Sequence, residues 1–434
     1  RFVNDVATHL SNMSRLMTMA EMRGFEPPDP RRVNSLAGSP IRPLWHISTV
    51  RKEPRLRIPA CPAAAKLAPC FRARSKDAGP KVGGMIRPDL KAIPANVAGA
   101  RNDDALKLSS NEAAHPPLPE AAAAMAEAVT KANRYPDIAA TALREDLAAH
   151  LGVDYGQVAV GTGSSALCQQ LVEIAATPGD EILFPWRPFE AYPIFAQVVG
   201  AHPIPVPLGA DQRVDLPAMA DKITDKTRLI FVCNPNNPSG TTVTKEEFAA
   251  FMDAVPADVL VALDEAYIEY NRATNIPLGT ELVGTYPNLV CLRTFSKAYG
   301  LAGVRIGYTF GPENIIEALN KVAIPFSAST VAQVGARAAL AAQDSLRERT
   351  DEAVGQRERL EEALQDWGVP HSEANHVWLP AANLARLGTP QEVAARLADR
   401  GVLVRAFSEG IRITVTTEEE TDTLLQAWNA TIGG

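Results

Sequence analysis

The chain has 434 residues, of which 46% are hydrophobic and 21% are charged, and its formal net charge is -7. This length favours two domains, and the composition is typical of a soluble globular protein rather than a disordered or fibrous one. The negative charge argues against nucleic acid as the main partner of the whole chain, and no apolar run is long enough to span a bilayer, so we expect no membrane partner.

The five cysteines are scattered along the chain, at Cys61, Cys70, Cys168, Cys233 and Cys291. None lies in a CxxC motif or in a Cys/His pair, so the sequence predicts neither a disulfide framework nor a zinc site, and we assign no metal. A reducing, cytoplasmic location fits this cysteine usage best.

Residues 1–84 differ from the rest of the chain, with 15 Lys and Arg against 6 Asp and Glu and with ten prolines. We expect disorder there, because such a segment cannot bury enough apolar surface to offset its ordering entropy. Three interpretations stay open: a basic nucleic-acid arm, an organellar transit peptide, or a non-native extension that precedes a start at Met85. We favour the last, because prolines this frequent leave no room for a helix-turn-helix.

From residue 86 onward, helical and strand patterns alternate. We predict helices over 118–132, 164–176 and 189–200, and strands over 157–161, 181–185, 228–234, 259–265, 288–294 and 304–310. Short, continuous apolar runs are typical of strands buried on both faces, so the pattern predicts an α/β fold with a mostly parallel central sheet. A long helical stretch at 329–367 and strand candidates at 374–380 and 411–416 predict a second, smaller α+β domain.

Polar and glycine residues follow four of the predicted strands where they end. These segments are "GTGSS", "NPNNPSG", "DEAY" and "TFSK", at 161–165, 234–240, 264–267 and 294–297. Ligands of open α/β sheets bind outside the carboxyl ends of the strands, so we expect the four segments to form one site.

The segment "VGTGSSAL" predicts a strand, a glycine turn and a helix. The backbone N–H groups of Ser164 and Ser165, at the helix N-terminus, suit a phosphate. A plain turn is the alternative interpretation, and the chain lacks the GxxxxGK[ST] motif of P-loop nucleotide enzymes.

Asn237 lies in "VCNPNNPSG", where two prolines restrict the loop and Gly240 permits a positive φ. The pattern predicts a rigidly held amide side chain. An Asx-rich turn without a ligand is the alternative.

Asp264 ends a strongly apolar strand, so its carboxylate needs a partner. The partner is either a cationic heteroaromatic nitrogen of a ligand or a structural ion pair with Arg293 or Arg305. Tyr267, three residues later, can direct a phenol to the same region.

Lys297 follows the next strand, in "RTFSKAYGLAGVRIGY". In a desolvated pocket its pKa falls, which makes the amine a nucleophile toward a carbonyl. Thr294 and Ser296 can donate to a phosphate, and Arg305 can pair with it through two hydrogen bonds. Phosphate, carboxylate, phenol, amide and lysine together match the needs of pyridoxal 5′-phosphate.

Read together, these motifs resemble the fold-type I pyridoxal-phosphate aminotransferases of the histidinol-phosphate aminotransferase group. Within that group the chain is most similar to the actinobacterial aromatic amino acid (phenylalanine) aminotransferases. The segments that carry the resemblance are "KLSSNE" (107–112), "NRYPD" (133–137), "SSALCQQL" (164–171), "WRPFEAYP" (186–193), "VCNPNNPSG" (232–240), "LDEAYIEY" (263–270), "RTFSKAYGLAGVRIGY" (293–308) and "IRITV" (411–415). The resemblance implies a large cofactor-binding domain over 129–325 and a small domain formed by 85–128 and 326–434.

The resemblance also implies roles for the residues around the cofactor ring. Lys297 is expected to bind the cofactor covalently and to move the proton between the substrate carbon and the cofactor. Asp264 is expected to keep the ring nitrogen protonated, Asn237 and Tyr267 to bind the 3′-oxygen, and Phe189 to stack on the ring.

The remaining roles concern the phosphate and the substrate. The resemblance assigns the cofactor phosphate to Ser164, Ser165, Thr294, Ser296 and Arg305. Tyr135 of a neighbouring subunit is expected to complete this site, which implies a homodimer with shared active sites. Arg412 is expected to bind the substrate α-carboxylate, and Asn111, His115 and Arg405 to lie near the substrate.

We predict transamination between an aromatic L-amino acid and 2-oxoglutarate, with small-molecule amino and 2-oxo acids as partners. Histidinol-phosphate enzymes usually read NENPYGP where this chain reads "NEAAHPPLP", which puts His115 in place of a tyrosine. Histidinol-phosphate transamination stays open as the alternative, because Arg405 can serve a second anionic group. A rival class is a pyridoxal-phosphate-sensing transcription regulator, which the basic residues 1–84 suggest.

Overall fold

The structure is a computed structural model of the chain, and it describes residues 86–93 and 104–433. The three interpretations of residues 1–84, and the regulator hypothesis that depends on them, lie outside the described residues. Cys61 and Cys70 lie there as well.

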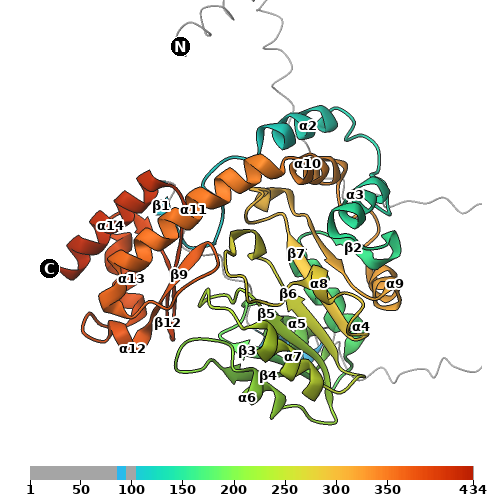
Figure 1. Cartoon of the computed structure of the whole chain (residues 1–434), viewed down its shortest axis with the longest axis horizontal. Helices are drawn as coiled ribbons and strands as arrows, with labels where there is room; N and C mark the ends of the chain where they lie inside the picture. The colour runs from blue at the N-terminus through green and yellow to red at the C-terminus, as the bar shows by residue number, and fades with distance from the viewer. Residues whose placement is uncertain (1–85, 94–103, 434) are drawn as a thin grey trace, which may run out of the picture. The chain divides into compact units, whose positions relative to one another are not determined.

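A seven-stranded sheet forms the centre of the larger part of the fold (Figure 1). In the order in which they lie side by side, its strands are β2 (Val158–Gly161), β8 (Gly307–Phe310), β7 (Leu289–Thr294), β6 (Leu260–Asp264), β5 (Thr227–Cys233), β3 (Glu181–Trp186) and β4 (His202–Pro207). Only β8 runs antiparallel to its neighbours. The predicted α/β fold with a mostly parallel central sheet is therefore confirmed.

The strands of this sheet are buried on both faces. Along β6, Val261 and Leu263 belong to one hydrophobic cluster and Ala262 belongs to another, on the opposite face. Along β7, Cys291 and Val290 divide in the same way. Successive side chains of a strand point to opposite faces, so a continuous apolar run can fill two cores at once.

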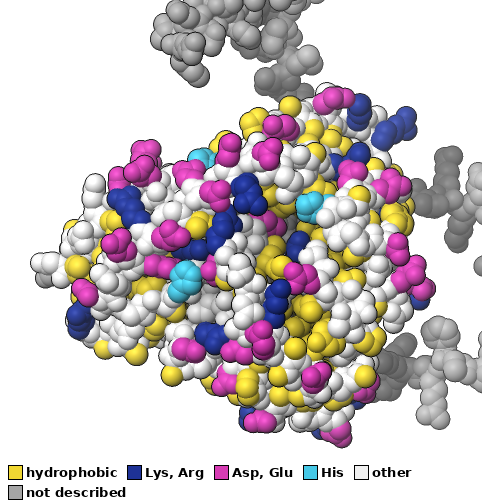
Figure 2. Space-filling model, in the orientation of Figure 1, with side chains coloured by type: hydrophobic (Ala, Val, Ile, Leu, Met, Phe, Trp, Pro, Cys, Tyr) yellow, Lys and Arg dark blue, Asp and Glu magenta, His cyan; other side chains and the backbone are white. Residues whose placement is uncertain are grey.

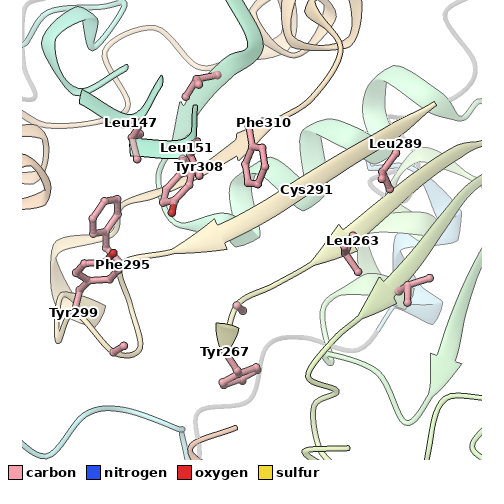
Figure 3. Close-up of a cluster of buried hydrophobic side chains, with 14 of the residues drawn as sticks. Leu147, Leu151, Leu263, Tyr267, Leu289, Cys291, Phe295, Tyr299, Tyr308 and Phe310 are labelled. Carbon is pink, nitrogen blue, oxygen red and sulfur yellow. The ribbon is translucent and has the colours of Figure 1, made fainter. Parts of the chain in front are cut away.

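Helices cover both faces of the sheet, and their buried side chains complete these two clusters. One face carries α2 (Pro119–Val129), α3 (Thr141–Leu151), α6 (Leu216–Ala220), α7 (Lys245–Ala254) and α10 (Thr330–Ala341). The other carries α4 (Ser164–Ala175), α5 (Tyr192–Val199) and α9 (Glu313–Val322). Figure 3 shows part of the first cluster, where Leu147 and Leu151 of α3 lie beside Tyr308.

Strand β4 was not predicted, and its composition explains why. Its sequence "HPIPVP" contains three prolines, which cannot donate to a sheet ladder and usually exclude a strand interior. β4 lies at the edge of the sheet and pairs only with β3, so one side of its backbone needs no strand partner.

The predicted helix over 329–367 is divided in two. Helix α10 ends at Ala341 and α11 (Gln343–Ala363) begins two residues later, with Ala342 in a non-helical conformation. The change of direction has a packing reason: α10 packs on α2 and α3, whereas α11 runs on to β9 and α14 (Figure 1). Helix α11 itself connects two cores, because Leu346 belongs to the first cluster and Leu360 to the third.

The smaller part of the fold is built around β9 (His376–Pro380), β12 (Gly410–Thr414) and β11 (Arg405–Phe407), an antiparallel sheet. Strand β1 (Leu106–Lys107) pairs in parallel with β10 (Val402–Leu403). Helices α11, α13 (Pro390–Ala398) and α14 (Glu418–Ile432) cover a third hydrophobic cluster.

Short elements complete the described chain. They are η3 (Pro88–Ala92), η4 (Tyr155–Gln157), η5 (Ile268–Tyr270), α8 (Gly279–Leu282), η6 (Ala302–Val304), η7 (Gln365–Trp367) and α12 (Ala381–Leu384). None of the helices that the structure describes is long and apolar enough to cross a membrane. Basic and acidic side chains are interspersed over the face in Figure 2, as is typical of a solvated surface.

The domain boundaries stay a proposal. The pairing of β1 with β10 supports a small domain that includes the first described residues. Helices α2 and α10, in contrast, contribute to the same cluster as the central sheet, and so does Leu346 of α11. Leu360 of α11 belongs to the third cluster, which favours a border within α11.

A buried ion pair joins the ends of two central strands. The side chain of Glu265 is fully buried, and its carboxylate accepts from Arg293 Nε at 2.8 Å and from the backbone N–H of Gly279 at 2.7 Å. Arg293 is the last residue but one of β7 and Glu265 follows β6, so the pair connects the strand that ends at Asp264 with the strand that precedes Lys297.

We expect Arg293→Leu to lower the free energy of unfolding by about 3–5 kcal/mol, because it leaves the Glu265 carboxylate buried without its cation. Urea denaturation followed by circular dichroism measures this loss. Arg337→Leu is the matched control, since its pair with Asp146 is 45% and 40% exposed and contributes about 1 kcal/mol at most. A loss for Arg293→Leu as small as that of the control would contradict the structural role of the pair.

Candidate active site

A cavity of about 350 Å³ lies at the carboxyl ends of β5, β6 and β7 and at the N-terminus of α4. Most of the predicted site residues line it: Ser164, Ser165, Phe189, Asn237, Asp264, Tyr267, Thr294, Ser296, Lys297, Arg305, Arg405 and Arg412. Sequence reasoning missed Ser109, Ser110, Glu190, Cys233 and Ala266, which line it too. Of these five residues, Ser109, Ser110 and Glu190 have polar side chains, and the side chain of Glu190 is charged.

Three predicted residues do not line the cavity. Asn111 is fully buried behind it and donates from Nδ2 to the Tyr267 hydroxyl at 3.0 Å. His115 Nε2 lies 2.8 Å from a carboxylate oxygen of Glu352, and both residues line a separate small pocket. Tyr135 is 83% exposed and stacks on Phe326, with 4.7 Å between the ring centres.

Asp264 lies at the inner end of the cavity as a buried carboxylate without an ion-pair partner among the described residues. Arg293, one of its two possible structural partners, is paired with Glu265, and the other, Arg305, hydrogen-bonds to Ser296, Ser165 and the Ala302 carbonyl. Burial raises the pKa of Asp264 to about 6. The structure thus leaves this carboxylate for a cationic ligand group.

Tyr192, from α5, donates its hydroxyl proton to the Asp264 carboxylate, and the backbone N–H of Ala266 donates to the other oxygen at 3.1 Å. The Tyr192 ring stacks on Phe231 of β5, with ring centres 4.1 Å apart. Sequence reasoning missed this contact, although Tyr192 lies in the segment "WRPFEAYP". The two hydrogen bonds orient the carboxylate without neutralising its charge.

The side chain of Lys297 lines the cavity and is otherwise surrounded by protein atoms. Its Nζ donates to the backbone carbonyl of Ser110 at 3.1 Å and lies 5.8 Å from the centre of the Tyr267 ring. Burial, with the nearby Arg412 and Arg305 guanidinium groups, lowers the pKa of the amine to about 7. A large share of Lys297 is therefore a neutral nucleophile at neutral pH.

The opposite end of the cavity is built for an anion. Arg305 Nη1 approaches Ser296 Oγ at 3.3 Å and Arg305 Nη2 approaches Ser165 Oγ at 3.3 Å, and no described carboxylate pairs with this arginine. Residue 163 must be glycine, because its φ is +76° and a Cβ there would lie 2.4 Å from Arg305 Nη2. Helix α4 begins at Ser164, so its first backbone N–H groups face the same space.

Arg412, on β12 of the smaller part, is a second cation without a carboxylate partner among the described residues. It donates from Nη1 to Asn237 Oδ1 and from Nη2 to the Ser109 carbonyl, each at 2.7 Å. Its Nε is buried without a hydrogen-bond partner. An unpaired, buried guanidinium is suited to a carboxylate ligand.

Arg405, in contrast, is paired. Its Nη2 donates to both carboxylate oxygens of Glu190, at 2.7 and 2.8 Å, and the two side chains are 30% and 45% exposed. The positive charge of Arg405 is therefore compensated by the negative charge of Glu190. The sequence did not predict this partner of Arg405.

Three comparisons with known proteins agree with this geometry. A family model described as "Aminotransferase class I and II" matches residues 103–427. A protein of Corynebacterium diphtheriae named aromatic amino acid aminotransferase is 61% identical over 346 residues, which cover 80% of this chain and 99% of that protein. One of Corynebacterium glutamicum with the same name is 57% identical over 350 residues, which cover 81% and 100%.

A solved structure is also similar. The histidinol-phosphate aminotransferase of Sinorhizobium meliloti, in complex with pyridoxal-5′-phosphate, has a TM-score of 0.73 and 28% sequence identity. The match covers 81% of this chain and 99% of that one.

The lowered pKa of Lys297 predicts its labelling behaviour in the cofactor-free protein. An amine-selective reagent should modify it with a midpoint near pH 7, because the neutral form prevails above that pH. Labelling at a series of pH values, followed by peptide mass spectrometry, measures the midpoint, and Lys297→Ala identifies the peptide. A midpoint at the ordinary lysine value of about 10.4 would contradict the desolvated environment.

Proposed function

Because the chain belongs to the class I and class II aminotransferases, we propose that it moves the amino group between an aromatic L-amino acid and 2-oxoglutarate. The names of its relatives support the aromatic substrate. The observation in the site that carries this choice is the Glu190–Arg405 pair, which leaves Arg412 as the cation for a substrate carboxylate.

The residues around the cavity fit pyridoxal 5′-phosphate, the cofactor of this family. An unpaired buried carboxylate lies at one end, and an unpaired arginine with a helix N-terminus lies at the other. When bound, this cofactor withdraws electrons from the substrate α-carbon and carries the amino group between the two half-reactions.

Four residues would hold the ring. Asp264 would keep the ring nitrogen protonated, because a buried carboxylate without a partner stabilises a cation beside it. Asn237 and Tyr267 would donate to the 3′-oxygen, and Phe189 would cover a ring face. Asn237 Oδ1 already accepts from Arg412, which leaves the Asn237 amide NH₂ for this role.

The phosphate would be held by groups that share one feature, a proton to donate toward the anion end of the cavity. These are the backbone N–H groups of Ser164 and Ser165, the hydroxyls of Thr294 and Ser296, and the guanidinium of Arg305. The conformation of Arg305, with φ of 62°, is uncommon outside glycine. Such a conformation is typical of a residue that its surroundings hold in place for a function.

Lys297 and Arg412 would act on the substrate. The amine of Lys297, with its pKa near 7, can accept a proton from the substrate α-carbon and return it. Arg412 would bind the α-carboxylate through two hydrogen bonds, which fixes the direction in which that carbon faces Lys297.

Substrate choice depends on what Arg405 can bind. An aromatic ring needs no cation, so it leaves the Glu190–Arg405 pair in place. A second anionic group, such as the phosphate of an imidazole phosphate or the side-chain carboxylate of glutamate, can pair with Arg405 only when it displaces Glu190. Glutamate serves both acceptors as the donor, so this requirement distinguishes only the two acceptors. Histidinol-phosphate transamination is therefore the second candidate, supported by the similarity to the Sinorhizobium meliloti structure.

A homodimer in the cytoplasm is also part of the proposal. Tyr135 is exposed and stacks on Phe326, which is exposed as well. A second copy seated on this surface would bury them, and its Tyr135 would complete the phosphate site.

The direct test compares amino acceptors. With glutamate as the donor, we expect kcat/KM for phenylpyruvate to exceed that for imidazole acetol phosphate by at least about tenfold. The reverse order would select the histidinol-phosphate reaction. Lys297→Ala should have no measurable turnover with either acceptor, and a fully active Lys297→Ala variant would contradict the assigned chemistry.

Glu190→Gln tests the specificity argument. It frees Arg405, so the ratio of kcat/KM for imidazole acetol phosphate over phenylpyruvate should rise about fivefold, the value of a half-exposed ion pair. Glu281→Gln, which breaks the exposed pair with Lys245, is the control and should leave the ratio unchanged. An unchanged ratio in Glu190→Gln would show that the pair does not select substrates.

A further inference from the structure

A row of buried polar groups lies behind Tyr267, outside the cavity lining. His376, on β9, is fully buried, and its ring meets the Tyr267 ring edge to face with 5.0 Å between centres. His376 Nε2 lies 3.3 Å from the backbone carbonyl oxygen of Asn236, and its Nδ1 lies 3.0 Å from Asn111 Nδ2. Asn111 Nδ2 also lies 3.0 Å from the Tyr267 hydroxyl oxygen.

The chemistry of these groups determines where each proton lies. A backbone carbonyl only accepts, so His376 Nε2 carries the proton and donates it to Asn236. The other nitrogen, Nδ1, then has a lone pair that accepts from the Asn111 amide. The imidazole is neutral, in the tautomer with its proton on Nε2.

Thr414 determines which way the Asn111 amide faces. The Thr414 hydroxyl accepts from the Asn111 backbone N–H at 2.9 Å, so it uses its own proton to donate to Asn111 Oδ1 at 3.2 Å. The amide oxygen therefore faces Thr414. Both amide hydrogens are left for His376 and Tyr267.

The result at Tyr267 is a directed phenol. Its oxygen accepts from Asn111, so its own proton is available to an acceptor in the cavity that Tyr267 lines. The Tyr267 side chain follows the carboxyl end of β6, as Figure 3 shows. If Asn111 presented its oxygen instead, the phenol proton would point away from the cavity.

The surroundings keep the imidazole neutral. Burial lowers the pKa of His376 well below its usual value, and the positive charges of Arg412, Lys297 and Arg357 act in the same direction. Asn236, which accepts from the ring, immediately precedes Asn237 in the same loop. His376 thus contacts Asn111, which binds the Tyr267 hydroxyl, and Asn236, which precedes Asn237 in the chain.

We propose that His376 is a positioning residue, which acts through Asn111 to direct the Tyr267 hydroxyl proton toward the cofactor oxygen. The inference rests on the proposed role of Tyr267 in cofactor binding. It does not depend on which substrate the enzyme uses, so the acceptor comparison and the test below can fail separately.

The variants are His376→Phe, His376→Asn and Tyr267→Phe. Phenylalanine fills the space but offers Asn111 no acceptor, whereas Asn Oδ1 can take the place of Nδ1. His202→Phe, at an exposed position on β4, is the matched control. The readout is the pH midpoint at which the absorbance of the cofactor-loaded protein changes, together with kcat.

A proton from Tyr267 stabilises an anionic oxygen on the cofactor, so its loss raises this midpoint. We expect His376→Phe to raise it by about one pH unit and to lower kcat about tenfold, as the loss of one hydrogen bond does. His376→Asn should restore most of both values. In a Tyr267→Phe background, His376→Phe should add no further shift of the midpoint, and an equal shift in both backgrounds would overturn the proposal.

A measurement on the unmodified, cofactor-free protein covers the case in which the variants fail to fold. Long-range proton–nitrogen NMR distinguishes the histidine tautomers, and the chain has seven histidines. We expect one ring with its proton on Nε2 at every pH from about 6 to about 8.5. A charged His376 ring, or a proton on its Nδ1, would contradict the hydrogen bonds from Asn111 to His376 and from His376 to Asn236.

Discussion

The unpaired charge of Asp264 is the constraint on which the rest of the site depends. A buried carboxylate is costly unless a cation compensates it, and Arg293, a candidate partner from the sequence, is paired with Glu265, which follows Asp264 directly. Tyr192 and the Ala266 N–H orient the carboxylate but leave its charge. The site we propose would place a cationic ring nitrogen beside this carboxylate, which would compensate its charge.

The cations of the cavity are sorted in a similar way. Arg305 and Arg412 line the cavity and have no carboxylate partner among the described residues, and we propose that they bind the cofactor phosphate and the substrate carboxylate. Arg405 has the same side chain but is neutralised by Glu190. We therefore propose that substrate specificity depends on which arginines already have a carboxylate partner within the protein. The presence of an arginine in the cavity does not by itself define the specificity.

Many of these features could be predicted from the sequence because they are local. Apolar runs that fill both faces of a sheet predicted β2, β5, β6 and β7, and the polar residues that follow them predicted Asp264, Asn237 and Lys297. The same rules failed at β4, where prolines are tolerated because the strand lies at the edge of the sheet. They also failed at Ala342, where the helix is interrupted between α10, which packs on α2 and α3, and α11, which runs on to β9 and α14. His115 illustrates another limit, since its place in a motif did not bring it to the cavity.

The sequence by itself determined the α/β class and predicted the segments and the lysine that we propose for cofactor binding, because residue type and spacing along one strand and its following turn carry that information. Only the tertiary structure decided which side chains are partners: Glu265 with Arg293, Glu190 with Arg405, and His376 with Asn111. The members of the last two pairs lie 215 and 265 residues apart in the chain. Hydrogen bonds and ion pairs act over a few ångströms. The role of a charged or proton-donating side chain therefore depends on which residues the fold places beside it.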